Sequence, residues 1–228
     1  MIQAKKLVKS FKNGNVETTI LKGIDFQVDA GEFIAIMGRS GAGKSTFLYQ
    51  LSLLDEPTSG EVIIDGRDTH AMTNVEKISY RLKNLGYVFQ DYALIPELTA
   101  VENVALPLLM QKLPKVEAYK IASEALLRVG LNSHFHQLPS QLSGGEQQRV
   151  SIARAVAHKP NILFADEPTA NLDNESSRIV MGIFNELHAA GQTIIMVTHE
   201  EEYGKMAQKI VKIDDGKIIA IVNSGAHK

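Results

Sequence analysis

The chain has 228 residues, of which 44% are hydrophobic and 22% charged, enough apolar content for a globular core. Because it contains no cysteine, disulfide frameworks, thiolate metal sites and thiol nucleophiles are excluded. The net charge of −2 gives no overall basic surface, so nucleic-acid binding is not expected. No apolar run is long enough to span a bilayer and the first residues carry no signal-peptide core, which predicts a cytoplasmic protein whose membrane role would need a partner.

The elements predicted along the chain change from strands to alternating strands and helices. Residues 28–33 are typical of a tight turn, and residues 60–66 alternate between two turn glycines, so the first third reads as β structure. Short apolar runs rich in β-branched or aromatic residues follow, as buried parallel strands require. These runs are residues 33–37, 86–89, 162–166 and 193–198.

The middle and the end of the chain carry different signals. Residues 91–156 have a helical pattern, in which Thr99 and Glu102 predict a capping box and Pro107 is expected to limit the helix. Residues 209–222 form two apolar runs around an Asp-Gly pair, which predicts a hairpin. Without a repeat, linker or low-complexity tract, the chain reads as one continuous globular unit.

A glycine-rich segment follows the first apolar run and precedes a helix expected over residues 46–54. It matches the P-loop pattern G-x-x-x-x-G-K-[ST]. The glycines let backbone amides surround a phosphate, the lysine supplies a cation for the β/γ oxygens, and the serine offers a hydroxyl to Mg²⁺. An ordinary strand-to-helix turn is the alternative. The predicted phosphate site is Gly38, Arg39, Ser40, Gly41, Ala42, Gly43, Lys44, Ser45 and Thr46.

Three polar residues follow the later strand runs. Asp166 would hold Mg²⁺ through water, and Glu167 at the strand tip would polarise the water that attacks the γ-phosphate. The alternative for this acidic pair is helix capping. His199 would contact the γ-phosphate or orient the water, although a solitary histidine at a strand end is more often structural.

Residues 142–149 read Leu-Ser-Gly-Gly-Glu-Gln-Gln-Arg and predict a second helix start. Ser143 and Glu146 have capping-box spacing, and the helix carries apolar residues on one side. Gly144 and Gly145 would leave its N-terminus open to an anion. The alternative is a capped helix after a flexible turn.

Beside a P-loop, this octet resembles the signature sequence of the ATP-binding cassette (ABC) ATPases. The resemblance covers essentially the whole chain and implies an α/β P-loop NTPase core with a mostly parallel sheet and flanking helices. It also implies an N-terminal antiparallel β subdomain and an inserted helical subdomain. Residues 1–90 and 157–228 would form the core with the β subdomain, and residues 91–156 the helical signature subdomain. The helix at Ser143 would meet the γ-phosphate on the partner's P-loop, which gives a head-to-tail homodimer with two ATP molecules between the subunits.

Smaller motifs fall in the family's order. Gln90 resembles the Q-loop glutamine that reaches Mg²⁺ and the membrane partner, residues 170–173 resemble the D-loop, and His199 resembles the switch histidine. Phe11 stands where the family carries an aromatic that stacks on adenine, with a plain core phenylalanine as the alternative. Glu146 replaces the more usual glutamine, which leaves the Ser143 and Gly145 contacts intact, so no loss of activity is expected.

Residues 53–60, 88–104 and 106–108 resemble the MacB/LolD/FtsE branch of the family. That likeness implies a separate membrane permease with few spans, similar to MacB or FtsX, and a location on the inner face of the membrane. A non-transport ABC protein acting on ribosomes or DNA is disfavoured, because one uninterrupted cassette without sustained heptads is present. A regulatory nucleotide switch with little turnover, of the cell-division type, remains an alternative.

Overall fold

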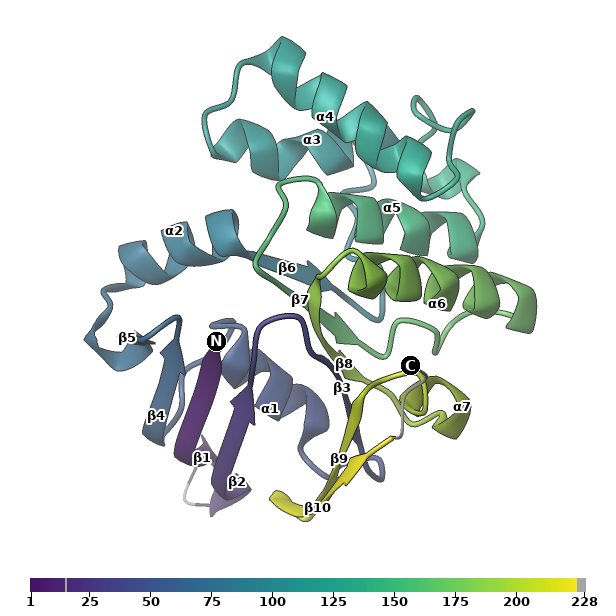
Figure 1. Ribbon diagram of the computed structural model, residues 1–228. Coiled ribbons are helices and arrows are strands. Elements are labelled where there is room, and N and C mark those ends of the chain that lie inside the picture. Colours follow the sequence, from purple (N-terminus) through teal and green to yellow (C-terminus); the bar gives the residue numbers. More distant parts are fainter. Residues whose placement is uncertain (15, 225–228) are drawn as a thin grey trace. The chain divides into compact units, whose positions relative to one another are not determined.

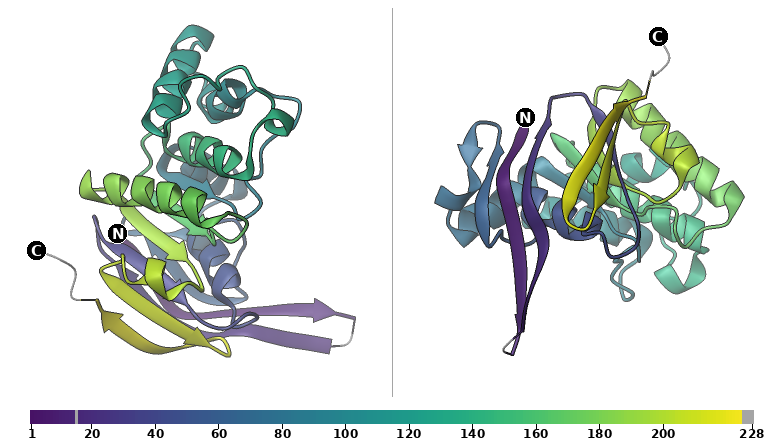
Figure 2. Two further views of the ribbon diagram at one scale, coloured as in Figure 1. Left: turned by 90° about the vertical axis from the view of Figure 1, so that its right-hand side faces the viewer. Right: turned by 90° about the horizontal axis from the view of Figure 1, so that it is seen from below.

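The computed structural model describes residues 1–14 and 16–224, which form two compact units (Figures 1 and 2). Unit 1 comprises Met1–Ser79 and Gly191–Lys228, and unit 2 comprises Tyr80–Ala190. Unit 2 is therefore an internal segment, flanked on both sides in the sequence by parts of unit 1.

The N-terminal part of unit 1 is an antiparallel sheet with the order β2-β1-β4-β5. Figure 2 shows β1 and β2 as a long two-stranded ribbon. Alternate residues such as Ile2 and Ala4 are buried, and the sheet's Phe26 meets Phe47 edge-on with ring centroids 5.2 Å apart. Apolar alternation therefore fixes which face of the sheet is covered. The strands are β1 (Ile2–Asn13), β2 (Val16–Val28), β4 (Ser59–Ile64) and β5 (Arg67–Asp68).

The second sheet segment of unit 1 is centred on β3 (Phe33–Met37). It pairs in parallel with β8 (Thr193–Val197) and β9 (Lys209–Asp214), and β9 continues into the antiparallel β10 (Lys217–Asn223). Every residue of β8 is buried, as a central parallel strand requires. The helical elements of unit 1 are α1 (Lys44–Leu51), η1 (Thr69–Ala71), the first part of α2 (Asn74–Asn84) and α7 (Glu201–Gly204).

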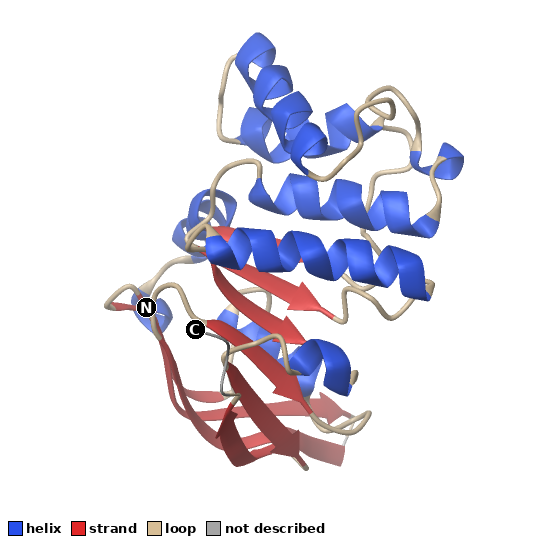
Figure 3. Cartoon of the chain, turned by 45° about the vertical axis from the view of Figure 1, so that its right-hand side comes forward, coloured by secondary structure: helices blue, strands red, loops and turns tan. Residues whose placement is uncertain are grey.

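Unit 2 contains two parallel strands and a group of helices (Figure 3). Helix α5 packs against α3, α4 and β6, so it lies at the centre of this unit. Its residues Val150, Ile152 and Ala153 are completely buried, which confirms its predicted core-facing side. The elements are β6 (Leu85–Val88), α3 (Ala100–Met110), α4 (Lys115–Arg128), η2 (Pro139–Gln141), α5 (Gly144–Val156), β7 (Ile162–Asp166) and α6 (Asn174–Ala189).

Most of the predicted elements are confirmed. The four apolar runs form β3, β6, β7 and β8 with bounds shifted by at most one residue, and the pairings β3–β8 and β6–β7 are parallel. The C-terminal hairpin turns at Asp215 and Gly216, which both have positive φ (44° and 73°), as a two-residue I′ turn demands. The first helix begins at Lys44 and ends at Leu51, earlier than expected at both ends.

The prediction for Pro107 is wrong. Helix α3 runs through this proline and ends three residues later, at Met110. Proline removes a hydrogen bond to the preceding turn, but Val104 and Leu108 on the same helix are buried to 2% exposure or less. Burial of that apolar face keeps the last turn helical.

Candidate functional site

The glycine-rich turn joins β3 to α1 and is built from left-handed glycines. Gly41 and Gly43 have φ angles of 78° and 98°, and Gly43 is the N-cap residue of α1. Only glycine adopts these angles without strain, which explains the spacing of the motif. Gly43 has no side chain to cap the start of α1, and a helix N-terminus that follows left-handed glycines is suited to bind an anion.

Neighbouring strands of unit 1 hold this turn in place. The Gly216 amide in the β9–β10 turn donates to the Ala42 carbonyl oxygen (3.1 Å). A Cβ added at Gly38 would lie 2.1 Å from the Ile213 carbonyl oxygen, so only glycine fits where β3 enters the turn. The C-terminal hairpin is therefore a structural support of the predicted phosphate site.

The side chain of Lys44 lies inside the turn. It is 7% exposed, and its Nζ donates to the carbonyl oxygen of Arg39 (3.1 Å), five residues earlier. The ammonium group is thereby held across the opening of the loop, where it would meet phosphate oxygens. Ser45 and Thr46 are half-buried in the first turn of α1, and the exposed side of the loop consists of Arg39, Ser40 and Gly41.

Two other predicted residues belong to unit 1. Phe11 on β1 is 49% exposed, and Lys9 Nζ lies 5.0 Å from its ring centroid, so Phe11 is a surface aromatic and not part of the core. His199 follows β8 and is exposed. The Thr198 amide donates to the Ile36 carbonyl oxygen (3.1 Å), so His199 lies at the same sheet edge as the end of β3.

The acidic pair lies at the end of β7 in unit 2. Asp166 is the last residue of the strand and is 5% exposed. Glu167 follows with a φ of 44°, a left-handed angle that is uncommon for a residue with a side chain. Its carbonyl oxygen accepts from the Ala170 amide (3.1 Å), which closes the turn after it. Such backbone strain is often found at functional sites.

Gln90 follows β6 and is exposed. The Asn171 side chain donates to the Gln90 carbonyl oxygen and to Asp91 Oδ1, both at 3.2 Å. The predicted Q-loop and D-loop therefore touch. Because β6 and β7 are parallel neighbours, Gln90 and the acidic pair lie at the same edge of their sheet.

Arg154 is a residue of this region that the sequence analysis missed. Its guanidinium donates to the carbonyl oxygens of Tyr92 (2.8 Å) and Ala93 (2.5 Å), two consecutive residues with left-handed φ angles of 60° and 51°. Burial lowers the pKa of Arg154 to about 10, which leaves it charged at neutral pH. Since its partners are backbone atoms about 60 residues away in sequence, no side-chain pattern could have revealed the contact.

The predicted capping box of α5 is confirmed. Ser143 donates to Glu146 Oε2 through both its amide and its hydroxyl (2.8 Å each), and the Glu146 amide donates back to the Ser143 hydroxyl (3.3 Å). On the other side of the carboxylate, His134 Nε2 lies 3.1 Å from Glu146 Oε1. The Ser143 amide contributes most to lowering the pKa of Glu146, helped by the Ser143 hydroxyl and by His134.

The glycines of the signature turn do not lie in open space. A Cβ at Gly144 would come within 2.8 Å of the Tyr92 hydroxyl oxygen, and one at Gly145 within 2.6 Å of Ser176 Oγ. The turn therefore packs against the Q-loop segment and the start of α6. Close packing is thus a second reason for glycine at both positions, besides the predicted access for an anion.

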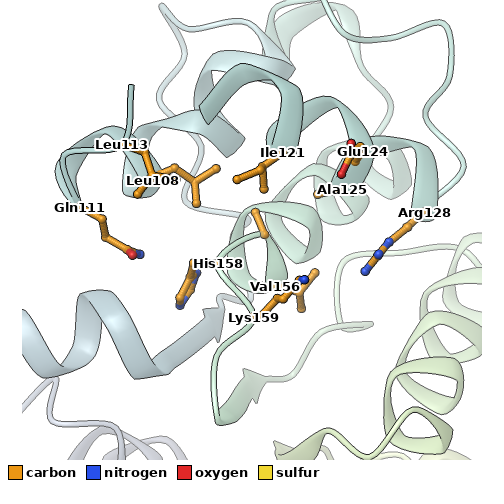
Figure 4. A pocket seen from close by; sticks show the side chains of 11 residues that line it. Leu108, Gln111, Leu113, Ile121, Glu124, Ala125, Arg128, Val156, His158 and Lys159 are labelled. Atoms are coloured by element: carbon orange, nitrogen blue, oxygen red, sulfur yellow. The ribbon is translucent and has the colours of Figure 1, made fainter. Parts of the chain in front are cut away.

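A cavity of about 290 Å³ lies in unit 2 between α3, α4 and the end of α5 (Figure 4). Apolar Leu108, Leu113 and Ile121 line it together with polar residues such as Arg128 and His158. Burial lowers the pKa of His158, whose Nε2 lies 3.1 Å from the Leu85 carbonyl oxygen. This side of unit 2 is hollowed and partly apolar.

The sequence pattern of the family described as "ABC transporter" matches residues 21–170. The uncharacterized ABC transporter ATP-binding protein MJ1508 of Methanocaldococcus jannaschii is 49% identical, with 98% of this chain and all of that protein covered. The lipoprotein-releasing system ATP-binding protein LolD of Aquifex aeolicus is 45% identical over 94% of this chain and 93% of LolD.

The macrolide export ATP-binding/permease protein MacB 2 of Aeromonas hydrophila is 42% identical over 96% of this chain, which spans 34% of that longer protein. Among solved structures, the dimeric post-hydrolysis state of the ATP-binding cassette MJ0796 bound to ADP and Pi superposes with a TM-score of 0.93. It is 38% identical, with both chains fully covered. The chain has the ABC ATPase fold, belongs to the ABC transporter family and is an ATP-binding, ATP-hydrolysing cassette of that family.

Proposed function

We propose that this cassette works as a head-to-tail homodimer with ATP between its subunits, and that it drives a separate membrane permease. The carrying observation is that each unit has its own glycine-rich helix start: the P-loop before α1 in unit 1 and the signature turn before α5 in unit 2. Each helix start is suited to bind an anion, and one ATP offers phosphates to both. The dimeric state in the description of the MJ0796 cassette supports this arrangement.

The geometry of unit 1 supports the nucleotide contacts proposed for it. Residues 38–46 would surround the phosphates with backbone amides, and Lys44 would turn its ammonium from the Arg39 carbonyl to the β/γ oxygens. Phe11, half-exposed on β1, would stack on the adenine.

The residues present fit Mg²⁺ of the P-loop type. Among residues 1–14 and 16–224, no group of three or more histidine or acidic residues could hold a metal by itself. That agrees with the preference of Mg²⁺ for a few protein oxygens, water and phosphate over an all-protein cage. We assign Ser45, Gln90 and Asp166 to the ion, which when bound would offset charge on the β- and γ-phosphates.

The hydrolytic step is assigned to the ends of β7 and β8. Glu167 would accept a proton from the attacking water, and His199 would orient that water and contact the γ-phosphate. Ser143 and Gly145 of the partner subunit's signature turn, with Gly144 and Glu146 beside them, would complete the site. Closure of the dimer would thus assemble the reaction centre, and hydrolysis would open it.

The permease is proposed from the relatives. MacB 2 is described as an ATP-binding/permease protein and is nearly three times as long as the matched segment, whereas this chain matches LolD over 93% of that protein. No helix within the described residues is both long and apolar enough to cross a membrane. We infer a few-span permease on a separate chain, contacted through the surface around Gln90, with the cassette peripheral on the inner face of the membrane. Residues 91–156 would be the helical subdomain that transmits closure, and residues 1–90 and 157–228 the catalytic core.

Size-exclusion chromatography with light scattering on Glu167→Gln tests this function. Loss of the base with an intact phosphate site should let MgATP trap the dimer, so the mass doubles only when MgATP is present. The matched control is Glu167→Gln with Lys44→Ala, which should stay monomeric. A Glu167→Gln protein that binds ATP but never dimerises would contradict the ATP-sandwich proposal. A wild-type turnover with the permease no faster than about one per minute would favour the regulatory switch.

A further inference from the structure

His134 lies at a corner of unit 2, beside the capped start of α5. Its Nε2 is 3.1 Å from Glu146 Oε1, and the other carboxylate oxygen accepts from the Ser143 amide and hydroxyl. The side chains of His134 and Glu146 are each 24% exposed. His134, Glu146 and Ser143 thus form one connected chain of contacts that ends at the first residue of the signature turn.

The backbone holds His134 at this place. The carbonyl oxygens of Phe135 and Gln137 accept from the Val101 (3.0 Å) and Ala100 (2.8 Å) amides, the first amides of α3. The His134 amide itself donates to the Leu131 carbonyl oxygen (3.3 Å). The loop is therefore attached to the N-terminus of α3, and the imidazole is presented to α5 from a fixed position.

The negative charge of Glu146 opposes the binding of a phosphate at this helix end. Hydrogen bonds from Ser143 and the charge of His134 keep the pKa of Glu146 below its ordinary value, so the carboxylate stays ionised at neutral pH. A carboxylate stabilises a helix N-terminus, but it repels a phosphate that approaches the same amides. A cation beside the carboxylate would remove that repulsion.

We propose that His134 is a positioning residue for the signature turn: its imidazolium holds and neutralises Glu146, so that the turn accepts the ATP phosphate of the partner subunit. The proposal rests on the ATP-sandwich function proposed above. The MgATP-dependent dimer is therefore tighter when residue 134 carries a positive charge beside Glu146 than when it carries none.

Two other charged groups lie near this corner. Arg149 on α5 also lowers the pKa of Glu146, by less than His134 does. His136 on the same loop acts on Glu102 of the α3 capping box, whose pKa is also lowered, mainly by Thr99. The ring of His134 contacts Glu146 at 3.1 Å, so substitution of His134 isolates the effect of that contact.

The experiment measures the dissociation constant of the Glu167→Gln dimer in MgATP at one fixed pH by sedimentation equilibrium. The constant should be about 3- to 5-fold higher in His134→Gln, which has no charge to offset Glu146, than in this parent. His134→Arg keeps a cation beside Glu146, so its dimer should be as tight as the parent's. In a Glu146→Gln background, where no carboxylate is left to offset, His134→Gln should have no further effect.

A His134→Gln dimer as tight as the parent's would overturn the proposal. If no protein dimerises, the ATP-sandwich function fails, and His134 is judged by the NMR shift of the Ser143 amide without nucleotide. That shift should change in His134→Gln and return towards the parent's value in His134→Arg. The same shift in the parent and in His134→Gln would also overturn the proposal. Thermal unfolding checks that each variant is folded.

Discussion

Two helices of this chain begin at glycine-rich turns, and the two turns are built in opposite ways. At α1 the N-cap is Gly43, which has no side chain to satisfy the first amides of the helix. At α5 the N-cap is Ser143, whose amide and hydroxyl both pair with Glu146. The start of α1 has no side-chain cap, whereas the start of α5 is capped by its own residues.

The difference bears on how firmly each turn would bind a phosphate. The P-loop depends on the β9–β10 hairpin for its shape, through the Gly216–Ala42 hydrogen bond. The cap of the signature turn is formed within unit 2, by Ser143 and Glu146. In the proposed ATP sandwich, an arriving phosphate would compete with the Ser143–Glu146 hydrogen bond. The proposed phosphate contact at the signature turn is therefore the weaker of the two.

The largest loss of stability is expected when a side chain is added at the close contact in the P-loop. Gly38→Ala would place a Cβ 2.1 Å from the Ile213 carbonyl oxygen, so the backbone must shift. We expect the free energy of unfolding to fall by about 3 kcal/mol, with loss of ATP binding. Urea unfolding and nucleotide titration measure both effects.

Gly182→Ala in α6 is the matched control. No atom lies within 4 Å of a Cβ added there, and the residue is inside a helix, so stability should rise by about 0.5–1 kcal/mol. A Gly38→Ala protein as stable as the wild type would show that the hairpin does not hold the P-loop.

The second prediction concerns ATP binding by the P-loop, which the monomer should carry out without the signature turn. Lys44→Ala should weaken ATP binding to the monomer about 30-fold or more, because a buried charge-assisted contact is lost. Fluorescent-ATP titration of the dilute protein checks this. Lys22→Ala is the control, since Lys22 forms a 2.6 Å pair with exposed Asp215 beside the same turn and should change the affinity less than twofold. Unchanged binding in Lys44→Ala would contradict the P-loop assignment.

The smallest loss of stability is expected at the capped start of α5. Ser143→Ala removes the N-cap and should cost about 1 kcal/mol of stability while leaving monomeric ATP binding unchanged. Thr99→Ala is the matched control, because Thr99 and Glu102 form a capping box of the same kind on α3. Both variants should lose similar stability in thermal unfolding, but only Ser143→Ala should weaken the MgATP dimer of Glu167→Gln. Equal dimerisation in the two would argue against a phosphate contact at Ser143.

The fold could be predicted where the signal is local. Runs of β-branched residues gave the buried strands, the Asp215–Gly216 pair marked the hairpin, and capping-box spacing located the starts of α3 and α5. Pro107 is a misleading local signal. Proline is a local helix breaker, but burial of the α3 face, which depends on the helices packed against it, outweighs the lost hydrogen bond.

The sequence by itself determined which residue types are available for the chemistry: glycines, a lysine, a hydroxyl and carboxylates stand at the spacings that suit phosphate and magnesium in a P-loop protein. The tertiary structure alone decided what supports them. Arg154 on two carbonyls of the Q-loop, Gly216 on the P-loop and His134 on Glu146 all join residues distant in sequence. Such contacts follow from packing and backbone direction, which no local pattern encodes.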